Sequence, residues 1–297
     1  MKNNKVIARV FGGLGNQLFI YAAARRLAIE NNADLILDNV SGFKRDFEYN
    51  RHYQLVHFNI AGRVASKTER LEPFSRIRRY LKRNTNKYLP ANMRTYISEA
   101  VNQDASQLIS LKVEKDIHLE GYWQSEDYFY DIKDTLQDEL TILSPIDEIS
   151  LSMLSEMHPV KAVALHIRFF ESPDLALKDE SFIQYYDEAV KLMESMVENC
   201  HYYIFSTDLS SARRLINLPD SRITLVDQNN GDENAYRDFW LMLQCDHFIL
   251  ANSTFSWWPA WLSNNEDKVV IAQKKNINTT DALSLSDRFF PDSWNLI

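Results

Sequence analysis

The sequence predicts an α/β fold with two Rossmann-like lobes, each built on a parallel sheet. Two observations predict this fold: apolar strands alternate with segments of helical periodicity, and the alternation occurs in two separate blocks. A chain of 297 residues is long enough for two such lobes.

The first block contains a strand, a glycine turn, a helix and a second strand. We expect the strands at residues 5–11 and 34–38, and the helix at residues 18–30, where apolar side chains recur three and four positions apart. This order of elements implies a parallel sheet with a right-handed crossover.

The second block repeats the alternation of strands and helices. Its expected strands are residues 161–168, 201–205, 223–226, 248–251 and 269–272, and its expected helices are residues 182–198, 210–216, 236–245 and 258–263. Pro145 and its polar neighbours separate the blocks, which predicts one lobe at residues 1–150 and another at residues 151–297. The last residues can pack back on the first lobe.

Composition and charge narrow the choice of partners. Lysine and arginine together number 33 and the acids 41, so the net charge is −8, which argues against binding along a nucleic-acid backbone. Cys200 and Cys245 cannot supply a zinc tetrad, and the sequence contains no HExxH, CxxC or Asp-x-Asp motif. We therefore expect no metal, no cofactor and no nucleic-acid partner.

We expect the protein to be cytoplasmic. The sequence contains neither a signal-peptide core nor an apolar run of about 18 residues that could span a membrane. Residues 70–94 concentrate basic side chains, with Ile77, Tyr80 and Leu81 at helical spacing. This segment is either a solvated helix face or a docking surface for anionic lipid or an acidic acceptor, so any membrane association is expected to be peripheral, at the inner face.

Three of the seven glycines, Gly12, Gly13 and Gly15, follow the first expected strand. Their spacing fits neither the dinucleotide fingerprint nor the Walker motif. The glycines either form a tight turn before the helix or let a ligand approach the backbone, with Asn16 and Gln17 as helix caps or as amide ligands.

Polar side chains also end the strand expected at residues 161–168. His166 and Arg168 lie two positions apart and therefore share one side of the strand, at the edge where parallel sheets bind ligands. Arg168 can hold a phosphate through two parallel hydrogen bonds and His166 can contact a base or ribose; the alternatives are a structural salt bridge and a buried, satisfied imidazole. Glu171 follows, close enough to pair with Arg168 or to act as a general base.

Two further groups occur in the second block. Asn252, Ser253, Thr254 and Phe255 stand at the start of an expected helix, either as a phosphate site or as an ordinary N-cap. Asp238 is the one carboxylate of a mostly apolar helix, where it either interacts with the helix dipole or recognises a purine by its N1–H and amino group.

Together these residues resemble the α-1,2-fucosyltransferases of glycosyltransferase family 11. The likeness rests on FGGLGNQLFIYAAARRLA from Phe11, NRHYQLVHFNI from Asn50, GYWQSEDYF from Gly121 and ANSTFSWWPAWL from Ala251. The resemblance implies a two-lobed variant of the GT-B architecture, a GDP-fucose donor held mainly by the C-terminal lobe, no metal, and inversion at the anomeric carbon. It implies as acceptor the 2-hydroxyl of a galactose-terminated oligosaccharide or lipid-linked glycan.

The resemblance also implies roles by position. Arg168 is placed on the diphosphate beside His166, Asp238 on the guanine, and residues 252–255 around the β-phosphate and base. The glycine turn, with Asn16 and Gln17, is placed near the diphosphate and the acceptor.

The sequence departs from the family motif His-x-Arg-Arg-Gly-Asp-Tyr at Phe169, Phe170 and Glu171. Glu171 is the expected general base, and Asp174 and Glu126 are the alternatives. The expected acceptor-facing residues are Asp46, Glu48 and the aromatic stretch 122–130.

Two other functions stay open. The altered motif HIRFFES is compatible with the transfer of a different GDP-linked sugar on the same scaffold. The chain is also compatible with a non-catalytic protein that binds a GDP-sugar or a glycan.

Overall fold

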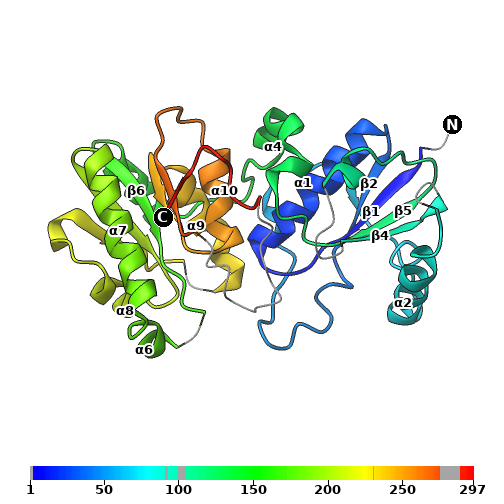
Figure 1. The fold of residues 1–297 in the computed structure, drawn as a ribbon, viewed down its shortest axis with the longest axis horizontal. Helices are drawn as coiled ribbons and strands as arrows, with labels where there is room; N and C mark the ends of the chain where they lie inside the picture. Colours follow the sequence, from blue (N-terminus) through cyan, green and yellow to red (C-terminus); the bar gives the residue numbers. More distant parts are fainter. Residues whose placement is uncertain (1–2, 91–92, 100–104, 171, 230, 275–287) are drawn as a thin grey trace. The chain divides into compact units, whose positions relative to one another are not determined.

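The computed structural model describes residues 3–90, 93–99, 105–170, 172–229, 231–274 and 288–297, which form two compact units. The first unit contains the described residues through Leu143 together with Arg288 and Phe289, and the second contains the described residues from Ser144 to Lys274 together with residues 290–297 (Figure 1). The boundary expected at residue 150 falls within helix α5 (Glu148–Met157) of the second unit.

The first unit is built on a parallel sheet with the strand order β3-β2-β1-β5-β4. Its strands are β1 (Lys5–Arg9), β2 (Asp34–Asp38), β3 (Arg63–Val64), β4 (Tyr96–Ser98) and β5 (Ile117–Glu120). Its helices are α1 (Leu14–Glu30), α2 (Ser75–Asn86), α3 (Ala105–Ile109) and α4 (Lys133–Glu139), with short 3-10 turns at Leu55–His57, Glu126–Tyr128 and Tyr130–Ile132.

The second unit is built on a parallel sheet with the order β11-β10-β9-β6-β7-β8. Its strands are β6 (Lys161–His166), β7 (Cys200–Phe205), β8 (Ile223–Leu225), β9 (His247–Ile249), β10 (Val270–Ala272) and β11 (Asn295–Leu296). Besides α5, its helices are α6 (Pro173–Ala176), α7 (Glu180–Met196), α8 (Leu209–Leu215), α9 (Ala235–Leu243) and α10 (Thr254–Leu262), with 3-10 turns at Asp220–Arg222 and Asp232–Asn234.

One hydrophobic core of the second unit lies between its sheet and α7. This helix buries Tyr185, Tyr186, Ala189 and Met193, which recur at helical intervals, against the central strands. The Tyr186 hydroxyl donates a hydrogen bond of 3.1 Å to the carbonyl of His166, so the core also fixes the end of β6. The C-terminal strand β11 pairs with β10 in this sheet.

The predicted α/β alternation is confirmed in both units. Two helices begin four residues earlier than expected, α1 at Leu14 and α10 at Thr254, because Gly13 and Ser253 adopt extended N-cap conformations before the apolar periodicity becomes clear. The sequence reading missed β3, β4 and β5, which have two to four residues each. These three strands contain polar residues and are not part of a longer apolar run, whereas the equally short β9 and β10 lie in the apolar runs FILA and VVIA.

None of the helices in the described ranges is long and apolar enough to cross a bilayer. Cys200 and Cys245 are both buried and free.

Candidate functional site

Polar residues of the second unit gather where β6 and β9 end. These strands are neighbours in the sheet and run parallel, so their carboxyl ends lie at the same edge. His166 is the last residue of β6, Arg168 follows two residues later, and α10 begins just after β9. The edge predicted to bind a ligand therefore brings together side chains about ninety residues apart in the chain.

His166 is a buried, neutral imidazole. Its Nδ1 lies 2.8 Å from the Ser256 hydroxyl, and its ring centroid lies 5.8 Å from that of Phe255. Burial, with a smaller contribution from the positive charge of Arg168, lowers the pKa of His166 to about 3. At neutral pH His166 therefore offers hydrogen-bonding groups to this edge without a second positive charge.

Ser256 was not among the predicted site residues. It is almost fully buried, and its only signal in the sequence is a hydroxyl three residues after the N-cap Ser253. Its contact with His166 joins α10 to β6 and fixes the orientation of the imidazole.

The side chains of residues 168–170 point alternately away from the core and toward it. Arg168 is half-buried, and its guanidinium carbon lies 5.3 Å from the ring centroid of Phe170, which is exposed. Phe169 instead packs against the core, with its ring 5.7 Å from that of Phe182. The phenylalanine that replaces the second arginine of the family motif thus contributes to packing, whereas Arg168 lies on the other side of the chain.

The start of α10 combines a cap with an anion-binding geometry. The Ser253 hydroxyl accepts a hydrogen bond of 3.3 Å from the Phe255 N–H, which satisfies one of the free amides of the first turn. Thr254 and Phe255 are half-buried and Asn252 is exposed. The positive end of the helix dipole is therefore presented at the same edge as His166.

Asp238 in the first turn of α9 forms a pair with Asn229. The Asn229 side-chain amide donates a hydrogen bond of 2.8 Å to the Asp238 carboxylate. The Oδ1 atom of Asn229 is buried and has no hydrogen-bond partner among the described residues. Burial raises the pKa of Asp238 to about 7, although the Asn229 hydrogen bond favours the ionised form.

Helix α9, which contains Asp238, packs against α10. Phe239, next to Asp238, has its ring centroid 6.2 Å from that of Phe255. Asp238 was predicted from the sequence, but Asn229 was not. Asn229 lies in the loop after β8, and the residues around it form no motif that would indicate a binding role.

The glycine turn lies at the corresponding edge of the first sheet, between β1 and α1. Gly12 has a positive φ of 80°, and a Cβ atom there would lie 3.0 Å from the Asn16 amide nitrogen, so the turn requires glycine. Gly13 is the N-cap of α1, and Gly15 is buried within the helix. The turn is therefore tight, as one of the two interpretations of its glycines predicted.

The two amides after the turn bind atoms of their own unit. Asn16 accepts a hydrogen bond of 2.7 Å from Gln124. Gln17 is completely buried; it donates to the carbonyls of Gly12 and His52 at 2.9 and 2.8 Å and accepts from the Gln54 N–H at 2.8 Å. The structure thus places Gln17 in the interior, where it holds the turn in position.

The described candidate bases and acceptor residues are divided between the two units. Glu171 lies outside the described residues. Asp174 is exposed in α6, and Glu126 is half-buried in the first unit.

Among the expected acceptor residues, Asp46 accepts hydrogen bonds from the backbone N–H groups of Tyr49 and Arg51, both at 3.2 Å, and Glu48 is exposed. Tyr122 packs on Phe11 with ring centroids 4.7 Å apart. The described residues contain no group of three or more His, Cys, Asp or Glu side chains that could hold a metal ion.

Two α/β units with parallel sheets, each with polar groups at the carboxyl edge of its strands, match the predicted two-lobed, GT-B-like fold class. The model of glycosyl transferase family 11 matches residues 5–297, and the chain belongs to this family.

Two curated relatives from Escherichia coli cover nearly the whole chain. Alpha-1,2-colitosyltransferase is 28% identical over 287 residues, which covers 93% of this chain and 95% of the relative. The O-antigen biosynthesis glycosyltransferase WbnK is 30% identical over 294 residues, which covers 89% of this chain and 92% of the relative.

The fold is also similar to that of NodZ alpha-1,6-fucosyltransferase, in a structure soaked with GDP-fucose. The TM-score is 0.55 at 14% identity, with 88% of this chain and 93% of that chain covered. The predicted family and the predicted fold class are therefore confirmed.

Proposed function

We propose that the protein transfers L-fucose from GDP-fucose to the 2-hydroxyl of a galactoside in a surface glycan, with inversion and without a metal ion. The family supports glycosyl transfer, and the name of the relative alpha-1,2-colitosyltransferase supports the linkage. The observation that carries the proposal is the pair of hydrogen-bond acceptors on Asp238 and Asn229 at the edge of the second sheet. The proposed location is the cytoplasm.

The acceptor pair suits guanine. Guanine presents two adjacent donors, N1–H and the 2-amino group, whereas adenine presents an acceptor at N1. The Asp238 carboxylate and the buried, unpartnered Oδ1 of Asn229 can accept from these donors. Because the free carboxylate has a pKa raised to about 7, hydrogen bonds from guanine would also stabilise its ionised form.

The diphosphate would lie against Arg168 and the first turn of α10. In the proposed reaction the acceptor 2-hydroxyl oxygen bonds to the anomeric carbon while the bond from that carbon to the β-phosphate oxygen breaks, and GDP leaves with the electron pair. Arg168 and the free N–H groups of the helix would stabilise the negative charge that develops on the phosphate. Glu171 is the proposed base that takes the hydroxyl proton.

The test is GDP release with galactose-terminated acceptors in the presence of EDTA. Because Arg168 would neutralise the leaving group, we expect Arg168→Ala to lower kcat by roughly 10²–10³-fold. Arg214→Ala, which changes an exposed arginine of α8, is the matched control and should leave the rate unchanged. A rate for Arg168→Ala within a few fold of the unchanged protein would contradict the proposed role.

Transfer of colitose from GDP-colitose is the second candidate, and it is favoured by the colitosyltransferase relative. Colitose lacks the 3-hydroxyl of fucose. A site that hydrogen-bonds this hydroxyl discriminates strongly against the deoxy sugar, so the ratio of kcat/KM for the two donors distinguishes the candidates. Tight GDP binding without sugar transfer or donor hydrolysis would instead indicate a non-catalytic binder.

A further inference from the structure

Helix α2 of the first unit packs on the sheet with its polar side. Ser75, Arg79, Lys82 and Asn86 share one face of the helix, and all four are at least partly buried. Asn86 accepts hydrogen bonds from the backbone N–H groups at the start of β4, and burial lowers the pKa of both Arg79 and Lys82. The face that most helices reserve for apolar side chains is therefore polar in α2.

The apolar side chains of α2 point away from the sheet. Ile77, Tyr80 and Leu81 lie three and four residues apart, so they form one stripe, and their exposed fractions are 58%, 59% and 54%. Phe74, just before the helix, is 73% exposed. A contiguous exposed stripe of large apolar residues is typical of a surface that binds a partner.

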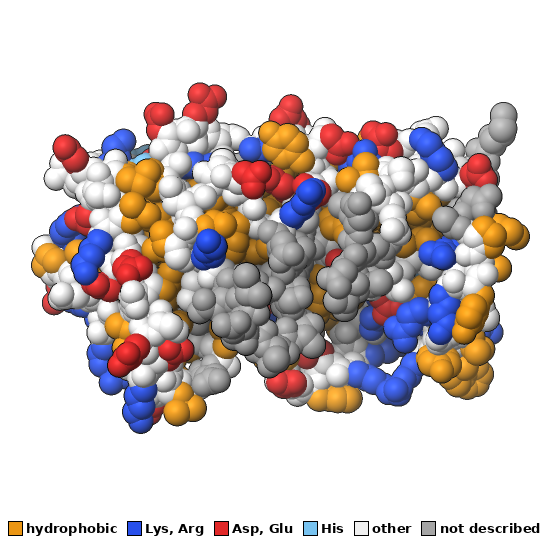
Figure 2. All heavy atoms as spheres, in the orientation of Figure 1, with side chains coloured by type: hydrophobic (Ala, Val, Ile, Leu, Met, Phe, Trp, Pro, Cys, Tyr) orange, Lys and Arg blue, Asp and Glu red, His pale blue; other side chains and the backbone are white. Residues whose placement is uncertain are grey.

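Positive charges flank the stripe. The helix contains five basic residues and no acid, although the whole chain has a net charge of −8. Arg76 and Arg83 lie along one side of the stripe and Arg78 along the other, and all three are exposed. Figure 2 shows hydrophobic and basic side chains next to one another over α2, at the lower right.

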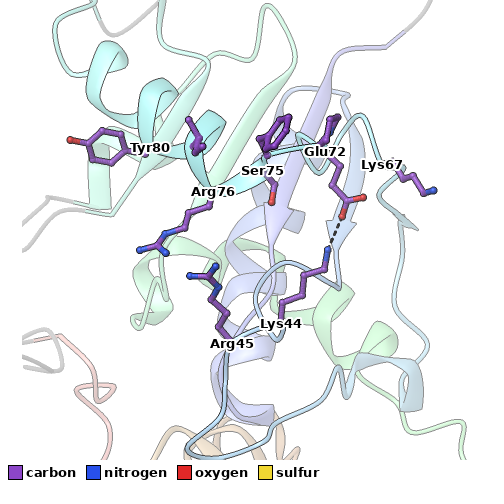
Figure 3. Close-up of a pocket in the computed structure, with 10 residues that line it drawn as sticks. Lys44, Arg45, Lys67, Glu72, Ser75, Arg76 and Tyr80 are labelled. Carbon is purple, nitrogen blue, oxygen red and sulfur yellow. Dashed lines mark hydrogen bonds and ion pairs between the residues drawn. The ribbon is translucent and has the colours of Figure 1, made fainter.

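An open hollow of about 920 Å³ adjoins the start of α2. Figure 3 shows Arg45 and Arg76 with their guanidinium groups turned toward each other at its rim, while Lys44 pairs with Glu72 at 3.0 Å. Among the described residues, Arg45, Lys67 and Arg76 have no carboxylate partner. Their charges are therefore available to phosphate groups.

We propose that α2 and this hollow dock the protein on the surface of an anionic lipid bilayer. The apolar stripe would enter the boundary between head groups and acyl chains, and the flanking cations would contact lipid phosphates. A second copy of the chain fits less well, because a symmetric contact through this face would bring the arginines of both copies together.

The test is sedimentation with vesicles of phosphatidylcholine, with or without a third of phosphatidylglycerol. We expect binding to the anionic vesicles, weakened by high salt, and little binding to neutral ones. The double variant Ile77→Glu/Leu81→Glu should abolish binding, and Arg76→Gln/Arg83→Gln should weaken it by at least roughly tenfold. All four side chains are exposed, so the fold should tolerate the changes.

The matched control is Ile149→Glu/Leu151→Glu on α5 of the second unit, where the two side chains are 61% and 46% exposed. It should bind vesicles like the unchanged protein. Equal binding to neutral and anionic vesicles, or binding that survives Ile77→Glu/Leu81→Glu, would overturn the proposal. The proposal would also be overturned if analytical ultracentrifugation showed a dimer of the unchanged protein, and if Ile77→Glu/Leu81→Glu were a monomer that still bound vesicles.

The docking proposal does not depend on the proposed donor. GDP binding by Ile77→Glu/Leu81→Glu, measured by calorimetry, should equal that of the unchanged protein. Loss of vesicle binding with intact GDP binding therefore tests the surface alone.

Discussion

The two sheets end in polar residues that are used in opposite ways. In the first unit, Gln17 directs three hydrogen bonds at backbone groups of its own unit, and Asn16 pairs with Gln124. In the second unit, Asn229 keeps a buried acceptor without a partner among the described residues, and the pKa of Asp238 is raised to about 7. The Asn16 and Gln17 amides of the first edge are closed on groups of their own unit, whereas Asp238 and Asn229 of the second edge leave acceptors for a ligand.

This difference shows why residue type alone does not identify a binding group. Amides at a strand edge can stabilise the fold or bind a ligand, and only their hydrogen-bond partners distinguish the two. A buried acceptor without a partner costs about 1–3 kcal/mol of stability, a cost that a bound ligand can remove. The comparison predicts that changes at the first edge affect mainly folding, and that changes at the second affect mainly binding.

The largest effect is expected at Gln17. Gln17→Ala removes the completely buried amide that binds three backbone groups, so we expect the free energy of unfolding to fall by about 3 kcal/mol. Chemical denaturation measures this loss. Gln184→Ala, which changes an exposed glutamine of α7, is the control and should alter stability by less than about 0.5 kcal/mol. If Gln17→Ala were as stable as this control, the first edge would not be closed as described.

The next effect concerns Asp238. Asp238→Asn replaces an acceptor-only carboxylate with an amide, so we expect the affinity for GDP to fall roughly 10–100-fold while the protein stays folded. Calorimetric titration with GDP gives the change in Kd, and a melting curve checks the fold. A variant that melts at a clearly lower temperature but keeps its GDP affinity would assign Asp238 to stability and remove the contrast between the two edges.

A smaller effect is expected at Ser256, which supports the fold and also orients His166, a candidate binding residue. Ser256→Ala removes the hydroxyl partner of the buried His166, so the free energy of unfolding should fall by about 1–2 kcal/mol. The exposed Ser155 of α5 supplies the control variant Ser155→Ala, which should leave stability unchanged. An unchanged stability in Ser256→Ala would mean that the imidazole does not need this partner.

The last effect is a pH dependence, and its signal in the GDP affinity is the smallest of the expected changes. The folded pKa of Asp238 is raised above its usual value of 3.8 to about 7, so the folded protein retains a proton that the unfolded chain releases near pH 4. The contribution of Asp238 to the free energy of unfolding is therefore fully present below about pH 4 and declines as the pH rises to about 7.

GDP binding should show the opposite trend, because the ionised carboxylate accepts both guanine donors. Between pH 6 and 8 the affinity of the unchanged protein should rise severalfold relative to that of Asp238→Asn. Titrations of both proteins at each pH remove the contribution from the ionisation of GDP itself. Parallel pH profiles for the two proteins would exclude Asp238 as the titrating group.

Local pattern predicted most of the fold. Long apolar segments such as β6 and α7 show their periodicity directly, and parallel topology follows from their order. The strand edge also predicted His166 and Arg168 as candidates, and Asp238 was predicted as the one carboxylate of a mostly apolar helix. Packing determined the rest: apolar spacing in α2 predicted a helix, but only the structure shows that its apolar side faces away from the sheet.

Contacts between residues that are far apart in the chain could not be predicted from the sequence. The role of Ser256 is shown by its contact with His166, ninety residues away. The role of Asn229 is shown by its hydrogen bond to Asp238 and by its own Oδ1 atom, which is buried and has no partner among the described residues. In the sequence, Phe169 is a departure from the family's binding motif; in the structure, its ring packs on Phe182 in the core. In each of these cases the role depends on a neighbour that local spacing does not specify.

The most direct measurement of the central claim is a calorimetric comparison of GDP and inosine diphosphate in the presence of EDTA. Inosine diphosphate keeps the N1–H donor but lacks the 2-amino group, so it should bind about tenfold more weakly than GDP. Asp238→Asn should reduce that preference. Equal affinities for the two nucleotides, or no heat on addition of GDP, would contradict guanine recognition by Asp238 and Asn229.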